Sequence, residues 1–403
     1  MKAVILAAGE GSRMYPLTQK RPKAMLPAAG KPIVERLAEE MAAAGIREII
    51  VVVGYLGDVI KEYLGDGGRL GVRVKYVYQE RADGTAAAMA LAQKALSDTF
   101  LVACGDSLVS QGDIAKLIKR GGSQIGVKEV EKPERFGVVG LEGDRVVRIL
   151  EKPHNPTSNL ISTGLYVFTP EIFKAINAVP RSLCGEYELT AGVQILIDSG
   201  VSVGCCHLDS WLDVSYPWDI LTAGEKLMES LESRNKGVVE AGAVINGMVR
   251  IGAGSIIRAG SYISGPVIIG RDCDVGPNCY IRASTVVGDG CRIGAGVELK
   301  NSVVMNGTNI AHLSYVGDSV VGENCNLGAG TKVANMRLDK GEVIANGIPT
   351  GRRKFGVVMG DEAQTGVGVC INPGTVVGGG AWLGPGVLAG GDVAQGARVF
   401  RAP

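Results

Sequence analysis

An apolar residue recurs every six positions through much of the second half of this chain, and this period restricts the possible folds more than any other feature. Successive steps of six fall on aliphatic residues or methionine at Val239, Ile245, Ile251, Ile257, Ile263, Ile269, Val275, Ile281, Val287, Ile293, Leu299 and Met305. With about a third of positions aliphatic, such a run arises by chance roughly once in a hundred thousand trials. The period predicts a β-helix of hexapeptide repeats, in which each short strand forms one side of a triangular coil.

Small or medium residues occur four places after these positions, as expected for side chains that fill narrow coils. They are Ala243, Val249, Ser255, Ser261, Val267, Cys273, Cys279, Thr285 and Cys291. This pattern accounts for three of the nine cysteines as interior residues. The chain has no Cys-x-x-Cys pair and only three histidines, which disfavours a zinc cluster. We expect reduced, mostly buried thiols.

The six-residue period is interrupted twice. It slips after Met305, resumes at Val321, Leu327 and Val333, and is lost again over 337–355. It then returns at Met359, Thr365, Ile371, Val377, Leu383 and Ala389. Interruptions of this kind place loops outside a rigid scaffold, where functional residues concentrate. The first interruption contains His312.

The first 220 residues instead alternate apolar runs with helical periodicity. This alternation predicts a mostly parallel sheet with helices on both faces, and ligands bind such sheets beyond the carboxyl ends of the strands. A further helix is expected from Pro217 to about Ser233. We expect an α/β domain over 1–220, a linker helix over 221–237 and a β-helix domain over 238–403. The expected strands are 3–8, 48–53, 72–78, 100–104, 164–168 and 201–206, and the expected helices are 34–44, 86–96 and 113–119.

Length and charge exclude several classes of protein. A chain of 403 residues is too long for one ordinary core, so two domains are expected. Its 42 basic and 41 acidic residues give a net charge of +1, without the basic excess that suits nucleic acid. No apolar run has the length of a membrane span, and the N-terminus enters a strand without a leader pattern. We expect a soluble cytoplasmic protein with neither nucleic-acid nor membrane partners.

The loop after the first strand has the composition of a phosphate site. Gly9, Gly11 and Ser12 leave backbone N–H groups open to an anion, and Arg13 and Lys23 add positive charge. The kinase-type phosphate loop is excluded because Ser-Arg, rather than Lys-Ser/Thr, follows the second glycine. A dinucleotide fingerprint is excluded because methionine occupies the place of its third glycine. Taken alone, an ordinary strand–turn with solvated basic residues remains an alternative.

Polar residues also follow two later strands. Asp106 ends a buried run, where a carboxylate suits Mg²⁺, although a turn role is equally open. The segment from Gln79 to Thr85 could read a nucleobase through the glutamine amide, with Gly84 against the ring. A polar loop leading into a helix is the alternative for that segment.

The combination Leu-Ala-Ala-Gly-x-Gly-Ser-Arg-Met…Pro-Lys-Ala-Met-Leu-Pro resembles the opening of the sugar-1-phosphate nucleotidylyltransferases. Gln-x₄-Gly-Thr-Ala, Glu-Lys-Pro, Gly-Glu-Tyr and Trp-x-Asp follow in the family's order. The resemblance implies Mg²⁺ on Asp106 and Asp213. For the nucleotide it implies Leu6, Ala8, Gly9, Gly11, Ser12, Arg13, Gln79, Gly84 and Thr85. For the sugar phosphate it implies Lys23, Gly137, Glu151, Lys152, Gly164 and Glu186, with Arg13 and Lys23 as catalytic residues.

Two positions depart from that family pattern. Ser215 replaces the usual glycine after the second metal carboxylate, and Ala191 replaces the usual aspartate after Leu-Thr. Asp219 has the position of a residue that starts a helix rather than of a metal ligand.

The segment His-Leu-Ser-Tyr-x-Gly-Asp…Asn-x-Gly-Ala-Gly-Thr…Asn resembles a second site. It is similar to the acetyltransferase site of the bifunctional N-acetylglucosamine-1-phosphate uridylyltransferase/glucosamine-1-phosphate acetyltransferase family. The resemblance implies His312 as the catalytic base and a left-handed, trimeric β-helix with sites between neighbouring prisms. It places the sugar phosphate on Arg282 and Lys300, the sugar on Tyr315, Asn326 and Asn335, and acetyl-CoA near Ala329 and Lys354.

The 336–354 segment is longer than in bacterial members of that family and resembles archaeal-type relatives. The resemblance as a whole implies a bifunctional enzyme that makes a UDP-N-acetylhexosamine. It would acetylate glucosamine-1-phosphate or galactosamine-1-phosphate with acetyl-CoA, and transfer a uridylyl or thymidylyl group with Mg²⁺ and release of pyrophosphate. Two alternatives remain: a single-activity nucleotidylyltransferase, such as a glucose-1-phosphate thymidylyltransferase, with an oligomerising or regulatory β-helix, and a non-catalytic regulatory subunit.

Overall fold

The computed structural model describes residues 1–182 and 185–400. Contacts between residues divide the chain into two compact units. The first unit contains 1–11, 21–25 and 32–214, and the second contains 12–20, 26–31 and 215–403. The division expected from the sequence, into residues 1–220, 221–237 and 238–403, remains a proposal. No helix of the described residues is both long enough and apolar enough to cross a membrane.

The first unit is built on a nine-stranded mixed sheet with the order β5-β4-β1-β6-β11-β8-β12-β10-β9. Its first four strands pair in parallel and are almost entirely apolar in β1 and β4, as befits strands buried on both faces. The strands are β1 (Lys2–Ala7), β4 (Glu48–Val53), β5 (Arg73–Tyr78), β6 (Phe100–Cys104), β8 (Ser123–Glu129), β9 (Gly137–Glu142), β10 (Arg145–Glu151), β11 (Leu160–Phe168) and β12 (Val203–His207).

The expected parallel sheet describes only part of this arrangement. β11 is antiparallel to both β6 and β8, and β10 is antiparallel to both β9 and β12. Antiparallel neighbours need no crossover helix, and a two-residue turn, Gly143-Asp144, joins β9 to β10. The residues between β9 and β10 therefore lack the helix that a regular βαβ repeat would require.

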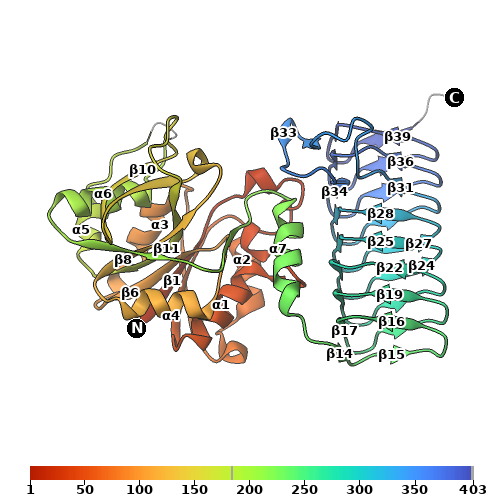
Figure 1. Cartoon of the computed structure of the whole chain (residues 1–403), viewed down its shortest axis with the longest axis horizontal. Helices are drawn as coiled ribbons and strands as arrows, with labels where there is room; N and C mark the ends of the chain where they lie inside the picture. Colours follow the sequence, from red (N-terminus) through yellow and green to blue (C-terminus); the bar gives the residue numbers. More distant parts are fainter. Residues whose placement is uncertain (183–184, 401–403) are drawn as a thin grey trace. The chain divides into compact units, whose positions relative to one another are not determined.

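Seven helices are described, and those of the first unit lie against the sheet (Figure 1). Amphipathic helices of this kind bury one face and leave the opposite face polar. In α1, for example, Ile33, Val34, Leu37, Ala38 and Met41 are buried. The helices are α1 (Ile33–Ala43), α2 (Gly57–Leu64), α3 (Thr85–Leu91), α4 (Gln111–Lys119), α5 (Ile172–Ile176), α6 (Leu189–Asp198) and, in the second unit, α7 (Asp219–Leu227).

The second unit contains a left-handed parallel β-helix whose short strands stack in three sheets (Figure 1). The first sheet has β14 (Arg234–Asn235), β17 (Val249–Ile251), β20 (Val267–Ile269), β23 (Thr285–Val287), β26 (Val303–Val304), β29 (Val320–Val321), β34 (Val357–Met359), β37 (Thr375–Val377) and β40 (Asp392–Val393). The second has β15 (Val238–Val239), β18 (Ile256–Ile257), β21 (Asp274–Val275), β24 (Arg292–Ala295), β27 (Asn309–His312), β30 (Asn326–Leu327), β35 (Gln364–Thr365), β38 (Trp382–Leu383) and β41 (Arg398–Val399). The third has β16 (Val244–Asn246), β19 (Tyr262–Ser264), β22 (Tyr280–Ile281), β25 (Glu298–Lys300), β28 (Tyr315–Gly317), β31 (Lys332–Val333), β36 (Cys370–Ile371) and β39 (Leu388–Ala389).

The strand register confirms the six-residue period and corrects one position. Ile251 pairs with Ile269 and Ile269 with Val287, each eighteen residues on, but Val287 pairs with Val304. The coil is therefore one residue short, and the inward position is Val304 rather than Met305. The slip precedes the methionine instead of following it. Both residues are apolar, so the sequence could not distinguish them.

The β-helix core consists mainly of aliphatic side chains, contributed by most of the strands and stacked coil upon coil. Cys273, Cys279 and Cys291 are buried among them, as expected, and Cys325 joins them. The eight described cysteines are free thiols, of which Cys370 is exposed; the ninth, Cys184, lies outside the described residues. Full burial of an aliphatic side chain stabilises a fold by about 1.5–3 kcal/mol, so the stacked core contributes to stability along its whole length.

Candidate active sites

The loop after β1 keeps its backbone exposed where a phosphate would approach. The carbonyl oxygens of Leu6 and Ala8 accept backbone hydrogen bonds at 2.8 and 3.2 Å, which tie the end of β1 to the loops that follow β6 and β4. Gly9 is exposed, with no atom within 4 Å of the place a Cβ would take. Gly11 adopts φ +66°, a conformation that favours glycine. This arrangement suits close approach of an anion.

A lysine and two aspartates meet at the carboxyl end of β6. Lys23 Nζ lies 2.7 Å from Asp106 Oδ2, and the lysine side chain is largely buried. The strands β7 (Ser107–Val109) and β13 (Trp211–Asp213) pair in antiparallel fashion, with Asp213 opposite Ser107. Val214 N donates to the Asp106 carbonyl at 3.1 Å. The structure therefore brings together three residues separated by up to 190 positions of sequence.

This donor set fits a hard cation. Asp106, just before β7, and Asp213, at the end of β13, offer carboxylate oxygens, which Mg²⁺ prefers. No group of three or more His, Cys, Asp or Glu side chains forms a complete metal site in the described chain. Mg²⁺ is commonly held by one or two carboxylates together with substrate phosphates. Burial and the nearby charge of Asp106 also raise the pKa of the Cys104 thiol, so this neighbouring cysteine stays protonated.

The expected nucleobase segment, residues 79–85, is held in place by hydrogen bonds and close packing. Gln79 is buried, and its Nε2 donates to the carbonyl of Gly84 at 3.2 Å. A Cβ on Gly84, whose φ is +100°, would lie 2.6 Å from the carbonyl oxygen of Tyr187. Thr85 Oγ1 accepts a hydrogen bond from Leu189 N at 2.9 Å. These contacts hold the base-side segment against the residues that precede α6.

The expected sugar-side residues also lie together. Glu151 Oε2 accepts a hydrogen bond from Thr190 Oγ1 at 2.9 Å, and Glu151 Oε1 pairs with Lys152 Nζ at 3.0 Å. A Cβ on Gly137 would lie 2.8 Å from Thr190 Cγ2 and 3.3 Å from Glu151 Oε2. A side chain at this position would therefore displace Thr190, which donates to this carboxylate.

A further acid, Glu188, was missing from the sequence interpretation. Burial and the adjacent Glu151 raise its pKa from 4.5 to about 7. Glu186 is exposed, and its Cβ lies 3.0 Å from the place a Cβ on Gly84 would take, so the sugar and base segments meet here. Gly164, with φ +77°, packs against Cys104, and a Cβ there would lie 2.8 Å from its sulfur.

Ser215 fits its position without strain. It is buried, and Asp219 Oδ2 accepts hydrogen bonds from Ser215 N at 2.9 Å and Tyr216 N at 2.7 Å. Its φ lies outside the left-handed region, so glycine is not required. Asp219 is the first residue of α7, as the sequence indicated, and its charge suits the positive end of a helix.

Ser12 and Arg13 belong to the second unit, on the 3₁₀ turn η1 (Ser12–Met14). Both are exposed. The Arg13 guanidinium lies over the ring of Tyr216, 5.8 Å from its centroid. That ring stacks on Trp218 at 4.8 Å. Contact with this aromatic pair therefore restricts the conformations available to the Arg13 side chain.

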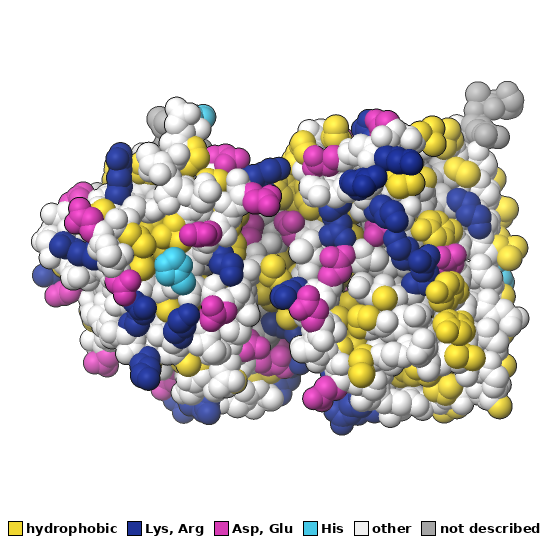
Figure 2. Space-filling view, viewed as in Figure 1, with side chains coloured by type: hydrophobic (Ala, Val, Ile, Leu, Met, Phe, Trp, Pro, Cys, Tyr) yellow, Lys and Arg dark blue, Asp and Glu magenta, His cyan; other side chains and the backbone are white. Residues whose placement is uncertain are grey.

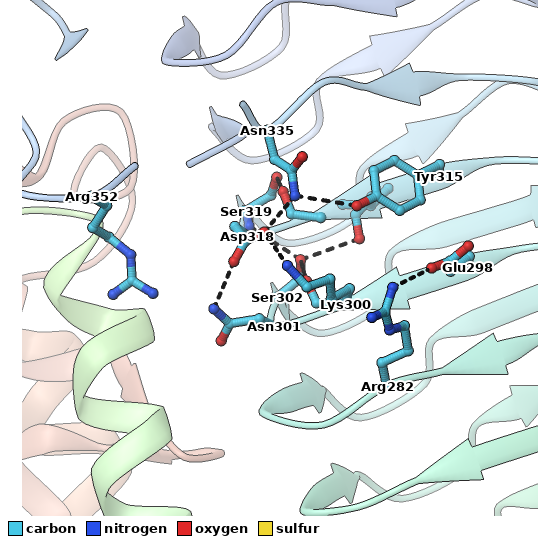
Figure 3. A network of polar contacts seen from close by, with 12 residues as sticks. Arg282, Glu298, Lys300, Asn301, Ser302, Tyr315, Asp318, Ser319, Asn335 and Arg352 are labelled. Carbon is cyan, nitrogen blue, oxygen red and sulfur yellow. Dashed lines mark hydrogen bonds and ion pairs between the residues drawn. The ribbon is translucent and has the colours of Figure 1, made fainter. Parts of the chain in front are cut away.

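Four residues expected at the acetyl-transfer site follow the third sheet of the β-helix (Figure 3). Arg282 Nη1 pairs with Glu298 Oε1 at 2.9 Å, and the Tyr315 hydroxyl accepts a hydrogen bond from Asn335 Nδ2 at 3.2 Å. Lys300 projects from the strand between them. Because β22, β25, β28 and β31 pair in register, residues far apart in sequence line one face of the prism.

A buried carboxylate, Asp318, organises this group. Its Oδ2 accepts from Lys300 Nζ at 3.0 Å and from Asn335 Nδ2 at 2.5 Å, and its Oδ1 accepts from Asn301 Nδ2 at 2.8 Å (Figure 3). Asp318 was present in the sequence motif but received no role. Burial, followed by the charge of Asp318, raises the pKa of the Tyr315 hydroxyl, which therefore remains protonated.

His312 and Asn326 belong to the second sheet instead. His312 is exposed at the end of β27, at the corner that precedes β28, and Asn326 is exposed on β30. Within the described chain, no side-chain contact joins either of them to the four residues of the third sheet. Ala329 is half-buried, and its carbonyl accepts a hydrogen bond from Gly368 N at 2.8 Å.

The 336–354 segment forms an ordered excursion. β32 (Ile344–Ala345) and β33 (Ile348–Pro349) make a hairpin across Asn346-Gly347, both with positive φ, as a two-residue turn requires. Lys354 is exposed and forms an isolated bridge with Met336. Arg352 instead turns to α7, where it pairs with Glu225. No sequence pattern indicated that last contact, since 127 positions separate its partners.

Two family models match the chain. The model described as nucleotidyl transferase matches residues 2–230, and the model described as the GMPPB C-terminal domain matches residues 263–379. A crystal structure of a putative glucose-1-phosphate thymidylyltransferase from Bacillus anthracis has a TM-score of 0.53 and 28% identity, and covers 58% of this chain and 98% of that one. The first unit therefore has known structural relatives.

Curated relatives extend over nearly the whole chain. The bifunctional protein GlmU of Methanocaldococcus jannaschii is 40% identical over 94% of this chain and 92% of its own. That of Methanococcus maripaludis is 38% identical over 100% and 97%, respectively. A low-salt glycan biosynthesis nucleotidyltransferase of Haloferax volcanii is 34% identical over 62% of this chain. The chain therefore belongs to the nucleotidyl transferase family and, by identity along both of its halves, to the bifunctional GlmU proteins.

Proposed function

We propose that the chain catalyses two successive reactions on one hexosamine phosphate, acetyl transfer followed by nucleotidyl transfer. One observation carries the proposal: Lys23, Asp106 and Asp213 meet in the first unit, while Lys300, Tyr315 and Asn335 meet in the second. The first group combines a lysine with two carboxylates, which suits a phosphate accompanied by Mg²⁺. The second combines a lysine with a hydroxyl and an amide, which suits a phosphorylated sugar. Figure 2 shows Lys and Arg side chains gathered over the β-helix, which suits anionic substrates.

In the nucleotidyl step, a phosphate oxygen of the sugar attacks the α-phosphorus of a nucleoside triphosphate. The bond from that phosphorus to the bridging oxygen breaks, and pyrophosphate leaves. Arg13 holds the departing phosphates, and Lys23 and Lys152 neutralise the reacting phosphate and the sugar phosphate. Mg²⁺, when bound by Asp106, Asp213 and the phosphates, supplies charge neutralisation. Positioning and electrostatic stabilisation provide most of such catalysis.

In the acetyl step, the amine of the sugar attacks the thioester carbonyl of acetyl-CoA. His312 accepts the amine proton, an amide forms, and the thiol of coenzyme A leaves. A positioned base of this kind contributes roughly 10²–10⁴-fold. Lys300 and Arg282 bind the sugar phosphate, Tyr315, Asn326 and Asn335 bind the sugar, and Ala329 and Lys354 lie near the acyl donor.

The remaining roles follow the same division. Gln79, Gly84 and Thr85 bind the pyrimidine, and the loop from Leu6 to Ser12 binds the triphosphate. Gly137, Glu151, Gly164 and Glu186 bind the sugar of the nucleotidyl step. UTP and dTTP, and glucosamine and galactosamine phosphates, are all admitted. We further propose a cytoplasmic homotrimer whose acetyl sites lie between neighbouring prisms, since His312 and Asn326 sit on a different sheet from Lys300.

Purified protein with a panel of hexosamine-1-phosphates, with and without acetyl-CoA and each triphosphate, tests the proposal. We expect His312→Ala to abolish acetyl transfer and to leave pyrophosphate release unchanged when the already acetylated sugar-1-phosphate is supplied. Asp106→Ala should do the reverse and lower pyrophosphate release by roughly 10²–10³-fold. Loss of both activities in either variant would contradict the two-site assignment. Nucleotidyl transfer alone, with every amine acceptor inert, would favour the single-activity alternative.

A further inference from the structure

The side chain of Glu225, on α7, joins three segments that lie far apart in the sequence. Its Oε1 accepts a hydrogen bond from Asn301 Nδ2 at 2.8 Å and an ion-paired hydrogen bond from Arg352 Nη2 at 2.5 Å. Arg352 Nη1 also donates to Thr222 Oγ1 at 2.9 Å. Thr222 and Glu225 are three positions apart and so share one face of α7. All four residues belong to the second unit.

Asn301 connects Glu225 to the proposed acetyl-transfer site. The same Nδ2 atom that contacts Glu225 donates to Asp318 Oδ1 at 2.8 Å, and Asp318 Oδ2 accepts from Lys300 and Asn335 (Figure 3). A flipped amide would turn its oxygen toward two carboxylates. The two acids together therefore fix the orientation of the Asn301 amide.

The backbone places Asn301 at this point. It occupies a corner of the prism with φ +45°, a conformation that asparagine tolerates better than most residues. Asp318, with φ +50°, occupies the same corner one coil later. The coil between them is also one residue short, because Val304 pairs with Val321 seventeen residues on. The two side chains are thus stacked by the register of the coils.

Charge balance makes the chain of contacts mutually dependent. The side chain of Asp318 is 4% exposed and that of Lys300 is 21% exposed, so each needs the other to offset desolvation. Arg352, at 18%, depends on Glu225 in the same way. Removing one carboxylate would leave a partly buried cation without its counter-charge and an amide with one acceptor fewer.

We propose that Glu225 is a positioning residue for acetyl transfer. It sets Lys300, and with it the KM for the sugar phosphate, through Asn301 and Asp318. Its ion pair with Arg352 separately anchors the 336–354 excursion, whose amide hydrogen exchange reports that contact. This inference rests on the proposed acetyl-transfer function of the third sheet. It assigns α7 a role in the chemistry of the β-helix in addition to its place in the chain between the two halves.

The test compares Glu225→Ala with Glu229→Ala in the full-length protein. Glu229 lies just beyond the end of α7 in an exposed ion pair with Lys226 at 2.7 Å and has no contact with Asn301, so its variant is a matched control. We expect Glu225→Ala to raise the KM for the hexosamine-1-phosphate at least about 5-fold, with acetyl-transfer kcat and pyrophosphate release within about 2-fold of wild type. Amide hydrogen exchange over 337–354 should also increase in Glu225→Ala alone.

A double-variant cycle tests the route through Asn301. Asn301→Gly removes the amide and keeps the left-handed backbone. If one route carries the effect, Glu225→Ala added to Asn301→Gly should raise the KM no further than Asn301→Gly alone. Multiplying effects would overturn the inference, as would a Glu225→Ala KM equal to that of Glu229→Ala. A joint fall in both activities and in thermal stability would overturn it too, as a structural effect. If the wild type acetylates no hexosamine phosphate, the proposed function itself fails and the inference falls with it.

Discussion

At the scale of single residues, the carboxyl group of Glu188 has a pKa well above the ordinary value for glutamate. Burial and the nearby charge of Glu151 raise its pKa from 4.5 to about 7 in the fold. A carboxyl whose pKa is raised by folding binds more protons in the native state than in the unfolded state between these two values. Its contribution to stability is therefore fully present below about pH 4.5 and is lost as the pH rises to about 7.

This linkage gives a testable pH dependence. Glu188→Gln should leave the urea midpoint nearly unchanged at pH 4.5 and raise it at pH 8, because the variant has no charge to bury. Urea unfolding at both pH values measures the difference. Glu142→Gln, which alters an exposed acid at the end of β9, serves as the control. A Glu188→Gln midpoint that follows wild type at pH 8 would contradict the assignment.

Gly84 should tolerate no side chain. Gly84→Ala places a Cβ 2.6 Å from the Tyr187 carbonyl oxygen at φ +100°, so either residues 79–85 move or the backbone is strained. We expect a loss of about 1–3 kcal/mol of unfolding free energy and a higher KM for the triphosphate. Gly45→Ala, at a φ of +91° with open space around the new atom, serves as the control. If both variants lose equally, backbone strain alone explains the loss, and the contact with Tyr187 does not matter.

Sequence patterns predicted single site residues unevenly. Asp106 and Asp213 were assigned together from the family resemblance, and Lys23 was placed beside the phosphate loop; the structure puts Lys23 2.7 Å from Asp106. Of the three, only Asp106 could be predicted from the end of a buried strand. Glu225 and Arg352 were not predicted as partners. A charged residue on a helix usually marks a solvated face, and only the folded chain shows that this carboxylate meets a distant arginine.

Among the structural elements, the two interruptions of the β-helix matter most. The second ends at Phe355, which is fully buried, packs edge-on against Trp218 at 5.8 Å and donates its N–H to the Asn335 carbonyl at 2.8 Å. Phe355→Ala should cost about 3–5 kcal/mol of stability and weaken acetyl transfer by loosening Asn335. Thermal unfolding and acetyl-transfer rates measure both effects. Phe400→Ala, at a residue that is 59% exposed, should change neither.

The fold of the second half was readable because each coil repeats the same inward position. The six-residue period gave the stacked core almost completely and failed at Met305, where a shortened corner moved the inward position to Val304. The strands of the first unit's sheet were predicted less completely from the sequence. β8, β9 and β10 had no expected counterparts, since antiparallel pairing needs no helix between strands and leaves a weaker periodic signal.

At the scale of the whole molecule, the outer surface of the β-helix bears on how copies of the chain associate. Outward apolar side chains follow the third sheet, and Tyr262 and Tyr280 contact each other edge-to-face at 5.6 Å while each remains about 40% exposed. If this face meets a second copy, Tyr262→Glu with Tyr280→Glu should dissociate the trimer and reduce acetyl transfer. Native mass spectrometry should show three 42.0 kDa chains for wild type and one for the double variant. A wild-type monomer, or a double variant that stays trimeric, would exclude this face.

The shortened coil at Asn301 has a consequence for how the protein can vary. Because each coil pairs only with the coils above and below it, copies of a complete turn could be added past β39 without displacing anything near Lys300. A corner can also change in length, as the shortened turn at Asn301 and the 336–354 excursion show, because the inward positions resume in register beyond each of them. Evolution can therefore lengthen this prism in whole layers or at its corners, whereas a residue inserted within a strand would turn inward groups out.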